Sequence, residues 1–263
     1  MALRREESRS PIKYRSLRVS GQSVDEARSA LVEKMFDGPA IFAIVFLIVA
    51  VLEWMDYLFN TPPKPWLWTV VSLVTISFAT WRYIRMRPLA KALRQAQEGE
   101  RAVGQYLERL RERGYTVFHD LIGSGFNVDH VLIGPAGVFT IETKTWSKPA
   151  RGKATITFDG EELKCGSNKP DRDPVIQALA QSSWMRELLK ESTGKTFHVW
   201  PVVLFPGWFI EESSKTKRRL WVLEPKALPA FLDNEPQRIA AEDVKLASFH
   251  LGRFIRSSEA AIR

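Results

Sequence analysis

Two apolar stretches near the N-terminus constrain the fold of this 263-residue chain more than any other feature. The first, residues 40–59, carries no charge from Ala40 to Leu52, and the second, residues 66–81, carries none at all. Twenty helical residues, at about 1.5 Å each, cover the roughly 30 Å hydrocarbon core of a bilayer. We therefore predict a hairpin of two membrane-spanning helices, at about 40–59 and 66–84. Two core helices, or a re-entrant hairpin, are the structural alternative.

The basic residues around these stretches predict their orientation. Several follow the second stretch, whereas the connecting loop, residues 60–65, has only Lys64. By the positive-inside rule, both ends of the chain then face the cytoplasm, as in an inner-membrane protein with two spans. The single cysteine, Cys165, excludes an intramolecular disulfide and agrees with a reducing compartment. The flanking basic residues are Arg28 and Lys34 before the first stretch and Arg82, Arg85, Arg87, Lys91 and Arg94 after the second.

The net charge of +8 gives weak support for nucleic-acid binding, because much of it lies near the apolar stretches. Residues 100–263 hold twenty-four Lys and Arg against twenty-one Asp and Glu, a net charge of only +3. Our predicted division of the chain is a basic cytoplasmic arm (1–38), the membrane hairpin (39–88), a compact domain (89–210) and a helical extension packed on that domain (211–263).

After the apolar stretches, the sequence alternates between helical and strand patterns. The period of the apolar residues predicts a helix from about residue 89 that Gly114 ends. Short β-rich runs separated by glycine turns then predict an antiparallel meander, and Asp159-Gly160 predicts a hairpin. Asp173 is predicted to cap the next helix, which is followed by a buried strand. This order is typical of an α/β fold with a mixed sheet. The meander strands are predicted at 115–122, 126–134 and 137–145.

The run GVFTIETKT, residues 137–145, is the most informative short segment. Side chains alternate along a strand, so Glu142 and Lys144 share one face. Asp129 lies in the preceding strand pattern, and antiparallel pairing brings it beside Glu142. Two carboxylates repel each other unless a cation lies between them, and oxygen ligands suit Mg²⁺ or Mn²⁺. A Glu–Lys pair on a solvated sheet face is the structural alternative.

The chain resembles the nuclease-related NERD domain, a branch of the PD-(D/E)XK nuclease fold. The resemblance lies in GERAVGQYL (99–107), in the run from Gly114 to Thr145 and in DPVIQALAQ (173–181). Together with PVVLFPGW (201–208), it covers roughly residues 95–210. It implies a restriction-endonuclease-like core in the order helix, three-stranded antiparallel meander, helix and strand, here preceded by the transmembrane hairpin.

The resemblance also implies roles for individual residues. The implied metal ligands are Asp129, Glu142 and the backbone carbonyl of Thr143, with Mg²⁺ or Mn²⁺ as the cofactor. The implied catalytic residues are Asp129, Glu142, Lys144, Glu100 and Gln177. Asn127-Val128 precede the aspartate where the superfamily name has a proline.

Structural alternatives exist for several of these residues. Glu100 is equally compatible with a position in the first turn of a helix or with an ion pair to an arginine. Gln177 and Gln181 lie one helical turn apart and also suit a solvated stripe. His130 points away from Asp129 and is interpreted as a packed histidine. Cys165 is interpreted as incidental.

Other catalytic classes lack their motifs: the sequence has no GxxxxGK[ST] loop, no G-x-S-x-G elbow and no HExxH. We predict a membrane-anchored, Mg²⁺-dependent nuclease that hydrolyses nucleic-acid phosphodiester bonds, with DNA as the expected substrate, on the cytoplasmic side. The resemblance implies 3′-hydroxyl and 5′-phosphate products. The alternative is a non-catalytic, membrane-tethered nucleic-acid-binding or scaffolding module. Its phosphate contacts would come from Lys215, Lys217, Arg218 and Arg219.

Overall fold

The structure is a computed structural model of the chain. It describes residues 17–59, 62, 65–123, 125–149, 153–165, 173–212 and 219–261. Most of the predicted basic arm, and Lys215, Lys217 and Arg218 of the predicted phosphate-binding cluster, therefore lie outside the described residues. The chain forms two compact units. One comprises Met1–Gly21 and Gly99–Arg263, and the other comprises Gln22–Glu98.

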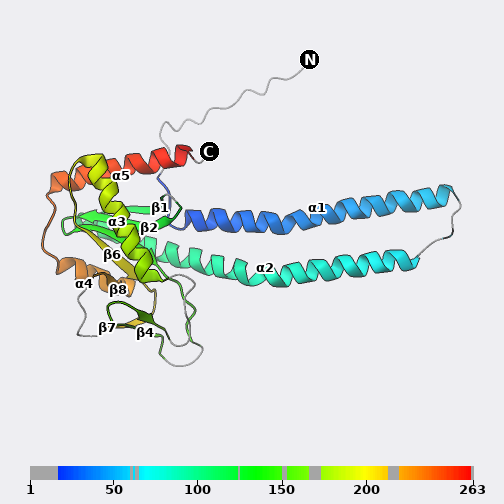
Figure 1. Ribbon diagram of the computed structural model, residues 1–263, viewed down its shortest axis with the longest axis horizontal. Coiled ribbons are helices and arrows are strands. Elements are labelled where there is room, and N and C mark those ends of the chain that lie inside the picture. Colours follow the sequence, from blue (N-terminus) through cyan, green and yellow to red (C-terminus); the bar gives the residue numbers. More distant parts are fainter. Residues whose placement is uncertain are drawn as a thin grey trace, which may run out of the picture. The chain divides into compact units, whose positions relative to one another are not determined.

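The unit Gln22–Glu98 is built from helix α1 (Gln22–Leu58) and most of helix α2 (Pro65–Glu108), which are shown in Figure 1. Nε2 of Gln97 donates to Oδ1 of Asp25 at 2.5 Å, and Nε1 of Trp68 donates to Oε1 of Glu53. These bonds join α1 and α2 near both ends of the pair.

Helix α2 differs from the prediction, because it is one continuous helix rather than a span at 66–84 followed by a second helix from residue 89. Pro88 lies inside α2 without ending it. A proline removes one backbone hydrogen bond from a helix, and the long helical segments on both sides continue past that loss.

Many apolar side chains of the unit Gln22–Glu98 are exposed, among them Phe46, Trp54, Trp66 and Ile76. Within the described residues, one helix, Trp66–Arg113, is long and apolar enough to cross a membrane, by length and composition alone. This helix contains the second predicted span and meets its requirement of length and composition, and the arrangement of two spans stays a prediction. Glu53 and Asp56 interrupt the other stretch, 40–59, and the side chains of residues 40, 41 and 43 lie outside the described residues.

The second unit contains a five-stranded sheet in the order β1-β2-β3-β6-β8. Its first three strands form the predicted antiparallel meander. β6 pairs in parallel with both β3 and β8, so the sheet is mixed, as predicted. The strands are β1 (Thr116–Ile122), β2 (Asn127–Gly134), β3 (Gly137–Thr143), β6 (Val199–Leu204) and β8 (Trp221–Leu223).

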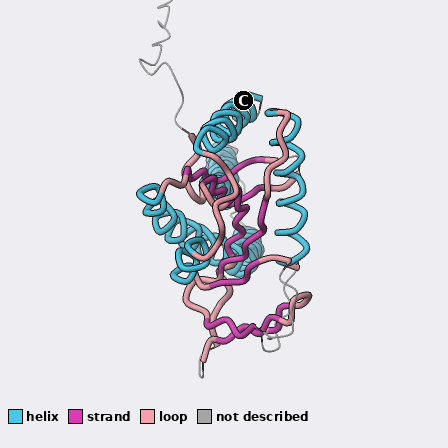
Figure 2. The backbone as a smooth tube through the Cα atoms, turned by 90° about the vertical axis from the view of Figure 1, so that its left-hand side faces the viewer, coloured by secondary structure: helices cyan, strands magenta, loops and turns pink. Residues whose placement is uncertain are grey.

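Helices cover both faces of this sheet, and Figure 2 shows the strands between them. Helices α3 (Pro174–Thr193) and α5 (Ala241–Ala261) pack on one face against residues such as Val131 and Ile133. Residues 99–108 of α2, with η1 (Arg109–Arg113), cover the other face together with η2 (Pro225–Ala227) and α4 (Leu228–Asp233). This layering agrees with the predicted α/β class.

Asp173 and Gly114 mark helix ends, as the sequence predicts. The side chain of Asp173 accepts a hydrogen bond from the backbone N–H of Val175 at 2.8 Å and so caps α3. Gly114 follows η1 with a φ of 83°, in the left-handed region that glycine adopts without strain. The chain therefore turns sharply from η1 into β1.

A smaller sheet has the order β5-β4-β7. β4 (Thr155–Phe158) and β5 (Leu163–Lys164) form the hairpin that Asp159-Gly160 predicts. β7 (Phe209–Glu212) is a strand that the sequence pattern did not predict. It is short and ends in two acidic residues, and its parallel pairing with β4 joins segments about fifty residues apart.

Candidate functional site

Strand β3 presents Glu142 and Lys144 on the same face of the sheet. Nζ of Lys144 donates to Oε1 of Glu142 at 2.5 Å. Phe139 and Ile141 pack into the core on the opposite face, as the alternation of a strand requires. The Lys144 side chain is 21% exposed and that of Glu142 only 4%. Lys144 is therefore the more exposed member of this pair.

Asp129 lies next to this pair on strand β2. His130 is opposite Ile141, so the next position of the register places Asp129 opposite Glu142. Oδ2 of Asp129 accepts a hydrogen bond from the backbone N–H of Thr143 at 2.7 Å. Burial raises the pKa of Asp129 well above its ordinary value of 3.8, and the charges of Glu142 and Glu100 raise it further. The antiparallel pairing thus brings the two expected carboxylates together.

Helix α3 contributes two glutamines to the same network. Oε1 of Gln177 accepts a hydrogen bond from Nζ of Lys144 at 2.9 Å. Nε2 of Gln181 donates to Oε2 of Glu142 at 2.6 Å and to the backbone carbonyl of Asn127 at 2.9 Å. The sequence favoured Gln177 over Gln181 as a functional residue. The structure places both at the site, with the Gln181 side chain fully buried and bonded directly to Glu142.

Glu100 reaches this region from the part of α2 that belongs to the same unit. Gly99 makes the close approach of α2 to Thr145, just beyond β3, possible. A Cβ atom at residue 99 would overlap the side chain of Thr145. Glu100 is 8% exposed. Burial raises its pKa to about 8, the charges of Asp120 and Glu142 add to this, and Lys144 opposes it.

Asp120 is a site neighbour that the sequence analysis missed. It lies on β1 between His119, which pairs with His130, and Leu121, which pairs with Val128. Its φ of 52° departs from regular strand geometry, and Asp120 occupies the position across from Asp129. The sequence feature that could have revealed Asp120 is an acidic residue inside the β-forming run TVFHDLI. A feature of the same kind pointed to Asp129.

The oppositely charged partner of Asp120 is Arg18. Nε of Arg18 donates to Oδ2 of Asp120 at 2.8 Å, and both side chains are buried. The two residues lie 102 positions apart in the sequence. No local sequence pattern connects them, so this ion pair could not be predicted from the sequence.

His130 is a packed histidine, as expected, and faces away from Asp129. It is fully buried, and its Nδ1 lies 2.9 Å from Nδ1 of His119. Nε2 of His119 lies in turn 2.8 Å from Oε1 of Glu108. Burial lowers the pKa of both histidines, well below the ordinary range in the case of His130. Cys165 is also buried, and burial raises the pKa of its thiol.

The carboxylate oxygens of Asp129 and Glu142 are of the kind that hard divalent cations prefer as ligands. Within the part of the chain that the structure describes, no three His, Cys, Asp or Glu side chains gather closely enough to hold a metal ion. A cation here would thus have the carboxylates of Asp129 and Glu142, with backbone carbonyl and water oxygens completing its coordination.

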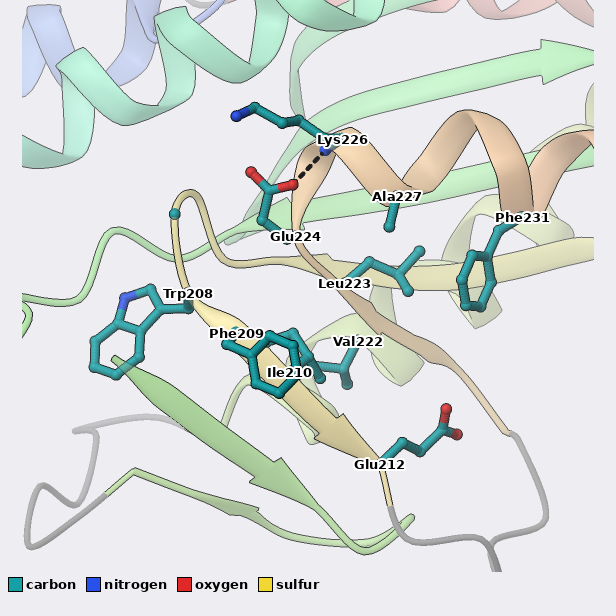
Figure 3. A pocket seen from close by; sticks show the side chains of 11 residues that line it. Trp208, Phe209, Ile210, Glu212, Val222, Leu223, Glu224, Lys226, Ala227 and Phe231 are labelled. Atoms are coloured by element: carbon teal, nitrogen blue, oxygen red, sulfur yellow. Dashed lines mark hydrogen bonds between the residues drawn. The ribbon is translucent and has the colours of Figure 1, made fainter. Parts of the chain in front are cut away.

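A cavity of about 520 Å³ lies elsewhere in the same unit, between β7, β8 and η2 (Figure 3). Trp208, Phe209, Ile210 and Phe231 give it a mainly apolar wall, and Glu212, Glu224 and Lys226 also line it. None of the carboxylate-site residues lines this cavity. The cavity is therefore separate from the carboxylate site.

The mixed α/β fold is consistent with a nuclease-like core. Comparison with protein families agrees with this, because residues 95–206 match the family model of the nuclease-related domain, NERD. The chain thus carries a nuclease-related domain over this range, which contains Asp129, Glu142, Lys144 and both glutamines. No curated protein and no solved structure matches the chain.

Proposed function

We propose that this protein is a metal-dependent nuclease that hydrolyses phosphodiester bonds, with DNA as substrate, at the cytoplasmic face of a membrane. The observation that carries the proposal is the contact network of Asp129, Glu142 and Lys144 across two neighbouring strands. The nuclease-related domain over residues 95–206 supports the same chemistry.

In this proposal Asp129, Glu142 and the backbone carbonyl of Thr143 hold Mg²⁺ or Mn²⁺. A cation bound there supplies positive charge for the phosphate and lowers the pKa of water. The protein contributes the fixed positions of its own donors and acceptors. The backbone N–H of Thr143 orients the Asp129 carboxylate, and Gln181 orients that of Glu142. Both carboxylates are therefore held in place before a substrate binds.

Lys144 positions the attacking water in this scheme. Its ammonium group is held between Glu142 and Gln177, and its side chain is more exposed than that of Glu142. A hydrogen bond from Nζ to the water, or to a phosphate oxygen, aligns the attack and stabilises the negative charge that develops. Attack at phosphorus breaks the bond to the 3′ oxygen, which leaves with a proton, and gives a 3′-hydroxyl and a 5′-phosphate.

The membrane part of the proposal is supported by the exposed apolar surface of the unit Gln22–Glu98. Large apolar side chains on both α1 and α2 are exposed, among them Phe46, Leu47, Leu73 and Phe78. Contiguous apolar surface of this kind is typical of contact with lipid. In the proposal both helices span the bilayer, and the basic residues after the second stretch keep both ends of the chain in the cytoplasm.

Cleavage of labelled duplex DNA by the full chain in detergent tests the chemistry. Lys144→Met is compared with Lys164→Met, a matched control whose ammonium group pairs with Asp159 at 3.1 Å on the smaller sheet. We expect Lys144→Met to lower the cleavage rate by about 100- to 1,000-fold, and the control to cleave like the wild type. Equal rates for the two variants would contradict the assignment of Lys144.

Labelling from outside intact cells tests the topology. Pro62→Cys, between the two helices, is introduced together with Cys165→Ser, which removes the single native cysteine. We expect a membrane-impermeant thiol reagent to label residue 62 in intact cells, and carbonate washing to leave the protein in the membrane fraction. Release by carbonate, or labelling only after lysis, would overturn the two-span arrangement.

Chelation distinguishes the nuclease from the alternative of a tethered binding module. A nuclease of the proposed kind stops cleaving DNA in EDTA. A binding module would retain DNA in EDTA with an affinity that falls steeply with salt and does not depend on Asp129. That outcome, without cleavage in Mg²⁺, would replace the nuclease proposal.

A further inference from the structure

The segment that precedes α1 belongs to the same compact unit as the carboxylate site. Oγ of Ser20 donates to the backbone carbonyl of Glu100 at 2.6 Å. Gly104, one turn further along α2, leaves the room for this contact, because a Cβ atom there would lie 2.5 Å from both Cβ and Oγ of Ser20. The segment is thus closely packed against the helical turn that carries Glu100.

Arg18 in this segment forms a buried ion pair. Its side chain is 6% exposed and that of Asp120 only 2%, and Nε and Oδ2 are 2.8 Å apart. A buried carboxylate requires a compensating partner, and removal of one member leaves the other charge uncompensated. Arg18 therefore compensates the buried carboxylate of Asp120 within β1.

Asp120 lies where β1 departs from regular pairing with β2. Its φ of 52° is uncommon for any residue except glycine, although aspartate tolerates it better than most. The neighbouring pairs, His119 with His130 and Leu121 with Val128, place Asp120 across from Asp129. Asp120 thus lies beside the strand segment that carries Asp129.

We propose that Arg18 is a positioning residue of the carboxylate site, which it orders by holding Asp120 across from Asp129. The proposal rests on the proposed nuclease function of that site. It makes the segment before α1 part of the catalytic module, although the helices α1 and α2 separate it from the nuclease-related domain in the sequence. Together, Arg18 and Ser20 attach this segment to β1 and to α2.

The test uses the full chain in detergent and four single variants. Arg18→Ala removes the ion pair, and Arg18→Lys keeps the charge but not the geometry of the guanidinium. Gly104→Ala displaces Ser20 and leaves both charges in place. Arg113→Ala is the matched control, because Arg113 pairs with Asp233 at 2.7 Å on the exposed surface of the same unit.

The first readout is steady-state cleavage of duplex DNA in Mg²⁺. We expect Arg18→Ala to lower kcat by about 100-fold while KM changes by less than about twofold, because a misplaced site loses rate rather than binding. We expect Arg18→Lys to have a kcat between those of Arg18→Ala and the wild type. Gly104→Ala should also lower kcat. Arg113→Ala should cleave at the wild-type rate. Wild-type kcat in Arg18→Ala overturns the proposal. If that variant does not fold, wild-type kcat in Gly104→Ala overturns it.

The second readout, hydrogen exchange without nucleic acid, does not depend on the proposed nuclease activity. We expect faster exchange over Thr116–Ile122 in Arg18→Ala and unchanged exchange over Val199–Leu204, which lies two strands away from β2. Unchanged exchange over Thr116–Ile122 would overturn the positioning role even if the wild type cleaves nothing. Faster exchange in a protein that never cleaves would uphold the positioning role and reject the nuclease function.

Discussion

Replacement of Gln181 by alanine tests how the site holds the buried carboxylate of Glu142. Gln181 is 1% exposed, and its Nε2 bonds both Oε2 of Glu142 and the carbonyl of Asn127. A hydrogen bond to a charged group contributes about 1.5–3 kcal/mol and a neutral one about 1 kcal/mol. Gln181→Ala leaves the buried Oε2 of Glu142 and the partly buried carbonyl of Asn127 without this donor. We therefore expect the free energy of unfolding to fall by about 3 kcal/mol.

Gln177→Ala is the matched control, because Gln177 lies one turn away on the same helix. It accepts one hydrogen bond from Lys144 in a partly exposed place, where water replaces it. We expect a loss below about 1 kcal/mol there. Urea unfolding of the full chain in detergent, followed by tryptophan fluorescence, measures both variants. Equal losses at the two positions, or no loss at Gln181, would refute the reasoning.

Two further predictions concern stability. Gly134→Ala places a Cβ atom against the ring of Tyr115, which is rigid and buried, so we expect a loss of about 1–3 kcal/mol in thermal unfolding. Gly252→Ala serves as its control and should be neutral or stabilising, because the new Cβ meets only ordinary contacts, with Arg256 of α5 and Phe118 of β1. A larger loss in the control would contradict the packing argument. Hydrogen bonds from the backbone N–H of Glu162, from Nζ of Lys164 and from the backbone N–H of Glu161 lower the pKa of Asp159 from 3.8 to about 2. A lowered pKa stabilises the fold above about pH 4 and loses this effect as the pH falls through 2. Asp159→Asn should therefore be less stable than the wild type at pH 6 and equal to it below pH 2, whereas a difference that persists in acid would count against this assignment.

The sequence predicted the parts of the fold that depend on local patterns. Alternating β-branched residues predicted the meander, and Asp173 predicted the start of α3. The same alternation placed Glu142 and Lys144 on one face, and antiparallel pairing then brought Asp129 beside them. These inferences succeeded because each depends on residues that are close in the sequence or on adjacent strands.

The remaining parts depend on contacts between distant segments. Arg18 meets Asp120 across 102 positions, and β7 pairs with β4 only because the chain returns to that edge. The choice between Gln177 and Gln181 depends on how α3 rotates over the sheet, since both lie on one side of the helix. Helical period alone does not fix that rotation, which the packing of Ala178 and Met185 against the strands determines.

The most direct test of the nuclease proposal is cleavage of labelled duplex DNA, single-stranded DNA and RNA by the full chain in detergent. Each substrate is incubated with Mg²⁺, Mn²⁺ or EDTA, and Asp129→Asn is measured beside the wild type. We expect cleavage of DNA by the wild type in the presence of either metal, and none in EDTA or by Asp129→Asn. Cleavage that continues in EDTA, or that Asp129→Asn performs at the wild-type rate, would contradict the central claim.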